Sequence, residues 1–229
     1  VALLFKEYSN AEQLFVSSSR PITALEMRRD LLHWDQALNL AKKLSVDQIP
    51  FISREYAQQL EFKSEYKLAL EMYQKGLTND SKDSKHDKLC HAGIVRMTFR
   101  LGDISKGISL ALQQNDKQLF RDCAAILEGL KQYNEAATLY EKGGQYDKAV
   151  TIYLKAKNYN AVGPLMEKIS SPNLQKQYGQ AMEEARKFVE AERAYELGKD
   201  FDSVIRVNLE KLGNIEKAFD LARKTRSPQ

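Results

Sequence analysis

A three-position pattern recurs nine times along this 229-residue chain and constrains its fold more than any other feature. In each copy an aromatic residue or Ile is followed three residues later by a small or β-branched residue. A third position lies four residues further on, and in the tightest copies it is Tyr. Positions i, i+3 and i+7 share one face of an α-helix, so each copy predicts a short amphipathic helix with a small residue at its middle. The nine copies are Trp34-Ala37-Ala41, Tyr66-Ala69-Tyr73, Ile104-Gly107-Ala111, Tyr133-Ala136-Tyr140, Tyr146-Ala149-Tyr153, Tyr159-Val162-Met166, Phe188-Ala191-Tyr195, Phe201-Val204-Asn208 and Ile215-Ala218-Ala222.

The pattern predicts an all-α protein, an α-solenoid of TPR-like short helical hairpin repeats with about fifteen helices and no strand. The low content of chain-breaking residues, five Pro and eleven Gly, agrees with this fold class. Because each helix pair needs its neighbours to cover its apolar face, we expect a single continuous repeat domain over residues 1–229. Arrays of this kind usually serve as surfaces that hold other proteins.

The helix spacing and the turn residues support the repeat. The closest copies begin 13 residues apart, which fits a helix of about ten residues, some 15 Å long, and a tight turn. Glycine favours the left-handed conformation that commonly ends a helix. We therefore expect Gly76, Gly143 and Gly198 to end helices in that conformation.

Three further segments predict breaks between helices. Ser171 followed by Pro172 is typical of a helix N-cap and first turn, so a helix is expected to begin there. Residues 49–53 are expected to break the chain before a helix that ends near Phe62. Residues 78–88 are expected to form a polar inter-helix loop, because nothing apolar follows Leu77 until the next helix.

The positions of the pattern are predicted to pack the repeats against one another. Ala149, for example, is expected to reject a larger side chain, whereas Asp147 on the adjacent polar side is expected to tolerate truncation. The predicted repeat-packing positions are Trp34, Ala37, Tyr66, Ala69, Tyr73, Tyr133, Ala136, Tyr140, Tyr146, Ala149, Tyr153, Phe188, Ala191, Tyr195, Phe201, Val204 and Ala218.

No pattern typical of catalysis occurs: GxGxxG, Walker A, HExxH and nucleophile-elbow motifs are missing from the sequence. The carboxylate pairs at Glu183-Glu184 and at Glu190 and Glu192 are interpreted as solvated helix faces. The repeated tyrosines resemble a series that stacks nucleic-acid bases, but their helical phase places them on the apolar face. We therefore expect neither an enzyme nor a cofactor or small-molecule site.

The one cluster of metal-type ligands is His86, Asp87, Cys90 and His91. A closed zinc site needs four ligands and supporting second-shell contacts. Nothing in the sequence brings the remaining histidine close, so a solvated helix start is the favoured interpretation and no metal is expected. Cys123 lies among apolar residues and is interpreted as a small buried side chain.

Charge and hydropathy exclude other classes of partner. The 35 basic and 31 acidic residues nearly balance, and no Arg-rich stripe with interleaved aromatics is present, so nucleic acid is not expected. No run of about 18 apolar residues occurs, so direct membrane insertion is not expected. Two cysteines without a CxxC motif favour reduced thiols in the cytoplasm. The apolar residues 1–5 suggest a segment of a longer protein.

An ordered series of short segments points to a family. The segments are WDQALNLA (residues 34–41), QIPFISREYA (48–57), QLEF (59–62), RDCAAILE (121–128) and SSP (170–172). Together they resemble the helical-repeat region of intraflagellar transport complex A subunits, most strongly over residues 34–225. The ring-Ala-Tyr pattern alone is less specific, because coatomer and other intraflagellar transport subunits use it too.

The resemblance implies WD40 propellers ahead of this segment in the full protein. It also implies a scaffold that contacts other complex A subunits and cargo adaptors in the cytoplasm, at the basal body and in the cilium. The process implied is tip-to-base transport and receptor import. The alternative is a vesicle-coat or other trafficking scaffold with the same propeller-plus-solenoid plan.

Overall fold

The computed structural model describes Ala2, residues 4–78 and residues 84–226. In these ranges every regular element is helical, and fifteen α-helices are present, which confirms the predicted all-α repeat fold. No helix of the described ranges is both long enough and apolar enough to cross a bilayer. The contacts group the chain into two compact units, Val1–Asn115 and Asp116–Gln229, so the expected single continuous domain stays a prediction.

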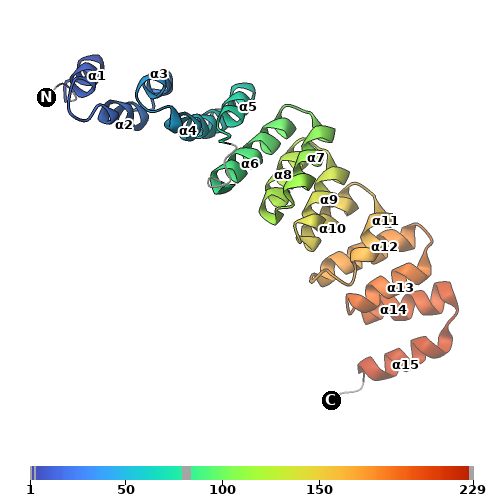
Figure 1. Ribbon diagram of the computed structural model, residues 1–229. Helices are drawn as coiled ribbons and strands as arrows, with labels where there is room; N and C mark the ends of the chain where they lie inside the picture. Colours follow the sequence, from blue (N-terminus) through green and yellow to red (C-terminus); the bar gives the residue numbers. More distant parts are fainter. Residues whose placement is uncertain (1, 3, 79–83, 227–229) are drawn as a thin grey trace. The chain divides into compact units, whose positions relative to one another are not determined.

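The first unit is built from seven α-helices within its described residues. They are α1 (Tyr8–Val16), α2 (Ile22–Asp30), α3 (Trp34–Leu44), α4 (Ile49–Phe62), α5 (Tyr66–Lys75), α6 (Ser84–Arg100) and α7 (Ile104–Gln114), with the 3-10 turn η1 (Val46–Gln48) before α4. Figure 1 shows α6 and α7 as neighbours joined by a short turn. Two apolar clusters form the interior: one surrounds Trp34 and Ile52, and the other surrounds Tyr73 and Met97.

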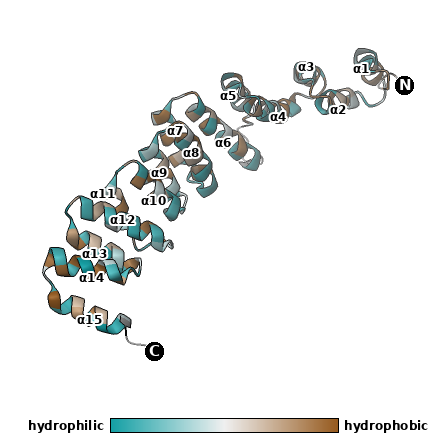
Figure 2. Cartoon of the chain, turned by 180° about the vertical axis from the view of Figure 1, so that it is seen from behind, coloured by the Kyte–Doolittle hydropathy of each residue, from teal (hydrophilic) through white to brown (hydrophobic). Residues whose placement is uncertain are grey.

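The second unit is built from eight α-helices within its described residues. They are α8 (Lys117–Gly129), α9 (Tyr133–Lys142), α10 (Tyr146–Lys155), α11 (Tyr159–Val162), α12 (Pro172–Glu184), α13 (Phe188–Leu197), α14 (Phe201–Val207) and α15 (Ile215–Arg226), with the 3-10 turn η3 (Gly163–Leu165) and the π-helical turn η4 (Asn208–Leu212). Figure 2 shows apolar and polar residues alternating along single helices such as α15, as amphipathic helices require.

Each copy of the pattern is preceded by a residue in the left-handed conformation. The left-handed residue stands two positions before the first residue of every copy, and the set is Leu32, Ser64, Gly102, Lys131, Gly144, Lys157, Arg186, Lys199 and Gly213. After Gly144, the amide of Gln145 donates to the carbonyl of Tyr140 at 2.9 Å, which closes the preceding helix. This turn leaves only three residues between consecutive helices such as α9 and α10, which accounts for the spacing of 13.

The expectation that three glycines end helices in the left-handed conformation is wrong. Gly76, Gly143 and Gly198 do follow helices, but all three have φ near −75° (−76°, −74° and −75°). Neighbouring atoms leave little room for a side chain at two of these positions. A Cβ on Gly143 would lie 2.9 Å from Arg121 Cγ, and one on Gly198 would lie 3.2 Å from the Pro172 carbonyl oxygen. The left-handed residue is the next one along, in two of the three turns.

Replacing Gly144 with Ala is expected to lower the free energy of unfolding by about 1 kcal/mol. The reason is conformational only, because φ is +74° and a Cβ there would meet no atom within 4 Å. Gly129→Ala is the matched control: Gly129 ends α8 with equally open space around it, and its φ is not in the left-handed region. Urea unfolding of both variants tests this, and a larger cost for Gly129→Ala would contradict the assignment of the turn.

Other boundaries also differ from expectation. Residues 49–53 lie inside α4 with Pro50 in its first turn, so the break falls earlier, at Ser45 and η1. Within the predicted loop 78–88, residues 84–88 belong to α6, and residues 79–83 lie outside the described residues. Ser171 precedes α12 as expected, but its side chain makes no capping hydrogen bond.

Candidate functional site

The small middle residue of each copy lies in the interior of its unit. The buried middle residues are Ala37, Ala69, Gly107, Ala136, Ala149, Val162, Ala191, Val204 and Ala218. The third-position tyrosines are buried as well: Tyr73, Tyr140, Tyr153 and Tyr195. First positions are more varied, since Trp34 is buried, Tyr66, Tyr133, Tyr146 and Phe188 are half-buried, and Phe201 is exposed. The packing role of the set stays a prediction, which a substitution at Ala149 tests below.

Glycines on neighbouring helices receive the buried tyrosine rings. A Cβ on Gly93 of α6 would lie 2.5 Å from the ring of Tyr73, and one on Gly179 of α12 would lie 2.7 Å from the ring of Tyr195. Real Cβ atoms do not approach so closely, so only Gly fits these two positions without a shift. Both glycines lie outside the three-position pattern, on the helix that packs against the tyrosine, so the pattern does not indicate them.

Three buried tyrosines donate their hydroxyl to a glutamate twelve residues earlier. The Oη–Oε2 distances are 2.6 Å for Tyr73 to Glu61, 3.0 Å for Tyr140 to Glu128 and 3.1 Å for Tyr195 to Glu183. Each bond joins a helix to the one before it across a left-handed turn. The fixed Glu-to-Tyr spacing was visible in the sequence and is the signal that sequence reasoning overlooked.

Two of these glutamates also bind an arginine from a later helix. Arg96 donates to both oxygens of Glu61 at 2.7 and 2.8 Å, and Arg206 donates to both oxygens of Glu183 at 2.6 and 2.8 Å. Ion pairs in which one arginine donates two hydrogen bonds to the same carboxylate are stronger than those with a single hydrogen bond. The interpretation of Glu183 as part of a solvated face is therefore wrong.

Glu192 does not lie on a solvated helix face either. It is buried, and its carboxylate accepts from Asn208 at 2.7 Å and from Lys217 at 2.6 Å. Glu190 remains exposed but accepts from the Tyr178 hydroxyl at 3.3 Å. The carboxylates of this unit thus link helices to one another, since each accepts from a different helix.

The Glu61 cluster predicts a pH dependence of stability. Burial opposes ionisation of Glu61, but hydrogen bonds from Arg96 and Tyr73 outweigh it and hold the pKa of Glu61 below its ordinary value of 4.5. A lowered folded-state pKa means stability that is present above 4.5 and lost as the pH falls through the folded value. Glu61→Gln should therefore be destabilising at neutral pH, and its deficit relative to the parent should shrink well below pH 4.5. Urea unfolding at both pH values measures this; a constant deficit would rule out an ionic contribution.

His86 and Asp87 of the metal-type cluster are already engaged in hydrogen bonds. Arg54 Nη1 donates to Nδ1 of His86 at 3.0 Å, and because guanidinium only donates, Nε2 carries the proton and donates to the Gly76 carbonyl at 2.7 Å. Asp87 accepts from the amide and hydroxyl of Thr78 at 2.9 and 3.0 Å. His86 and Cys90 are buried contacts between α4, α5 and α6, which corrects the expected solvated helix start. No group of three or more potential ligands in the described residues is arranged to hold a metal ion.

Three tyrosine hydroxyls and the Cys90 thiol hold their protons at neutral pH. Burial raises the pKa of Cys90 to about 11. Burial, together with a neighbouring glutamate, raises the pKa of Tyr140, Tyr178 and Tyr195 to about 12. These groups act as hydrogen-bond donors and are poor nucleophiles, because the ionised forms are disfavoured.

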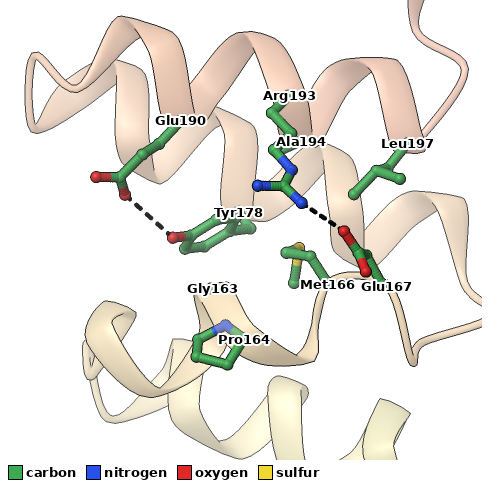
Figure 3. Close-up of a pocket in the computed structure, with 9 residues that line it drawn as sticks. All are labelled: Gly163, Pro164, Met166, Glu167, Tyr178, Glu190, Arg193, Ala194 and Leu197. Atoms are coloured by element: carbon green, nitrogen blue, oxygen red, sulfur yellow. Dashed lines mark hydrogen bonds and ion pairs between the residues drawn. The ribbon is translucent and has the colours of Figure 1, made fainter.

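A pocket of about 390 Å³ opens in the second unit between η3, α12 and α13. Figure 3 shows Tyr178 and Met166 inside it, with Glu190 on one side and Glu167 on the other. Arg193 on α13 pairs with Glu167, and both side chains are largely exposed.

The pocket coincides with an interruption of the repeat. The copy that begins at Tyr159 predicts a helix through Met166, but α11 ends at Val162 and continues as the 3-10 turn η3. Pro164 lacks the amide that a longer α-helix needs, and Gly163 lies against the Tyr178 hydroxyl, 3.2 Å from where its Cβ would be. Departures from a local rule of this kind concentrate at functional sites.

Comparison with known proteins supports one family. The family model for the TPR domain of intraflagellar transport proteins 140 and 172 matches residues 94–228. The chain is 51% identical over 227 residues to WD repeat-containing protein 19 of Homo sapiens, covering 99% of this chain and 17% of that protein. It is 41% identical over 228 residues to WD repeat-containing protein dyf-2 of Caenorhabditis elegans, covering 98% of this chain and 16% of that protein.

Among solved structures, that of BtubC (BKLC) from P. vanneervenii is similar over 90% of this chain and 94% of its own, with 11% identity and a TM-score of 0.39, too low to support a conclusion. The family model covers more than half of the chain. The helical repeats, their turns and this match together place the chain in the family of intraflagellar transport TPR domains that the model describes.

Proposed function

We propose that this chain is a non-catalytic scaffold segment of an intraflagellar transport complex A subunit. It contacts other subunits of that complex and cargo adaptors, and it serves retrograde ciliary transport and receptor import. It acts in the cytoplasm, at the basal body and in the cilium. It works without cofactor, small-molecule substrate, nucleic acid or direct insertion into a membrane, and residues 1–229 act as one continuous repeat array.

The observation that carries the proposal is the identity of 41–51% across nearly the whole chain with WD repeat-containing protein 19 and dyf-2. The internal chemistry agrees with a scaffold: the glutamates Glu61, Glu183 and Glu192 are engaged in contacts between helices. The matched family favours this function over the vesicle-coat alternative.

Deletion of residues 34–225 from the full-length protein tests the proposal in ciliated cells. We expect the remaining protein to separate from the other complex A subunits on co-purification, and ciliary material to accumulate at the tip. Re-expression of the intact protein at matched abundance is the control. Normal co-purification together with normal cilia would contradict the scaffold function, and loss of Golgi coat recruitment would favour the alternative.

A further inference from the structure

The turn before α10 lacks a carboxylate that the turn before α14 has. Asp200 stands directly before α14, where its Oδ2 lies 3.5 Å from Nζ of Lys176 and its Oδ1 accepts from the amide of Ser203. Gln145 stands at the same place before α10 on a matching backbone, with φ −98° and ψ 67° against −92° and 70° for Asp200. Gln145 carries no charge and makes no capping hydrogen bond, and its buried Oε1 has no hydrogen-bond partner among the described residues. The position that Asp200 fills before α14 therefore holds no anion before α10.

The cation that such a carboxylate would meet is present at the earlier turn. At the later turn, a Cβ on Gly198 would lie 3.3 Å from Lys176 Cγ. At the earlier turn, a Cβ on Gly143 would lie 2.9 Å from Arg121 Cγ, at the same separation along the chain. Arg121 thus corresponds to Lys176. Its Nε donates to the Gly143 carbonyl at 2.8 Å, and within the part of the chain that the structure describes no carboxylate pairs with its guanidinium.

A groove of about 330 Å³ opens beside this turn and is lined by more basic than acidic side chains. Lys148 and Lys168 line it, both are exposed, and neither pairs with a carboxylate of the described ranges. Their Nζ atoms lie 5.5 Å from the ring centre of Tyr140 and 5.4 Å from that of Tyr146, contacts that position an amine without neutralising it. Asp147, the acidic residue of this lining, already accepts two hydrogen bonds from the segment before α12. A carboxylate that enters the groove would therefore meet uncompensated positive charge.

We infer that this groove receives a Glu or Asp side chain from an acidic segment of a partner protein. The carboxylate lies near Lys148 and Lys168, at the turn where Arg121 adds a third positive charge. It supplies from outside the anion that Asp200 supplies within the chain before α14. Opposite charge selects this partner, because the cations of the groove lack a carboxylate of their own. The inference deepens the proposed docking function and rests on it.

Peptide binding to the 229-residue chain tests the groove. The probes are three capped pentapeptides with Glu, Gln or Lys at the centre and Gly elsewhere, and the readout is the NMR amide signal of Gly144, which lines the groove. The amide signal of Gly102, in a left-handed turn of the first unit, is the control. We expect the Glu peptide to shift the Gly144 signal and to bind about threefold more tightly than the Gln peptide, a difference typical of one exposed charge pair. The Lys peptide should leave the signal unchanged.

Three variants separate the groove from general charge effects. Gln145→Asp should place the missing carboxylate within the chain, so this variant should melt at a higher temperature than the parent and bind the Glu peptide about threefold more weakly. Lys168→Gln should weaken binding by about threefold as well. Lys155→Gln is the matched control, because Lys155 is also an exposed lysine beside a tyrosine ring, 4.6 Å from the centre of Tyr133, and it does not line the groove. Binding should be unchanged by this control.

Thermal melts show whether the lysine variants remain folded. Equal binding of the Gln peptide, preference for the Lys peptide, an equal loss with Lys155→Gln, unchanged binding by Gln145→Asp or no shift with any probe would each overturn the site. Co-purification of the full-length protein with complex A subunits tests the scaffold function separately. Intact co-purification alongside failed peptide binding would leave that function standing and remove only the groove.

Discussion

Replacing Tyr73 with Ala is expected to lower the free energy of unfolding by about 3–5 kcal/mol, the cost of deleting a large buried aromatic side chain. The ring is 1% exposed, packs against Gly93 and is held at its hydroxyl by Glu61. Its loss leaves a cavity between α5 and α6 and removes a hydrogen-bond donor from a carboxylate. Both losses act in the same direction, so this is the largest single effect that we expect.

Two variants separate the parts of that effect. Tyr73→Phe keeps the ring and removes only the hydroxyl, so it should cost about 1.5–3 kcal/mol, the range of one hydrogen bond to a charged group. Phe62→Ala on α4 is the control for ring loss, because Phe62 is 91% exposed and should cost little. Urea unfolding of the three variants gives the comparison. Equal costs for Tyr73→Ala and Phe62→Ala would show that Tyr73 does not anchor the first unit.

Ala149→Leu is expected to lower the free energy of unfolding by about 1–3 kcal/mol through overpacking. Ala149 is the buried middle residue of α10, and the pattern places the neighbouring helix directly against it. Thr151→Leu is the matched control: it adds a large side chain on the exposed face of the same helix. Thermal melts that rank Thr151→Leu as the more damaging variant would mean that the packing face is assigned wrongly.

The control suggested by the sequence, Asp147→Ala, is unsuitable. Asp147 lies on the polar side as expected, but its carboxylate accepts from the amide of Ser170 at 2.9 Å and from its hydroxyl at 2.8 Å. Removal of Asp147 would therefore release the segment before α12 in addition to changing a helix surface. Helical phase identifies the face of a residue, but it does not identify partners more than twenty residues away.

Local periodicity was enough to place the start of each of the nine helices that carry the three-position pattern. The three-position pattern repeats on the period of the α-helix, and a run such as Tyr146-Ala149-Tyr153 satisfies propensity and amphipathicity together. The family resemblance rested on ordered short segments, and it agrees with the 51% identity over 227 residues to WD repeat-containing protein 19. Turn placement was less accurate, because a left-handed Lys131 or Arg186 carries no glycine signal.

Only the tertiary structure shows which polar groups are bonded to one another and where the helical repeat is interrupted. Glu183 links three helices because a tyrosine and an arginine from two other helices converge on it, and His86 is bonded on both nitrogens because Arg54 and Gly76 face it. The pocket beside Pro164 exists because a broken helix leaves space against α13. Period and propensity depend on neighbours along the chain and are readable from it, whereas burial, pairing and cavities depend on distances between helices, which the order of residues does not state.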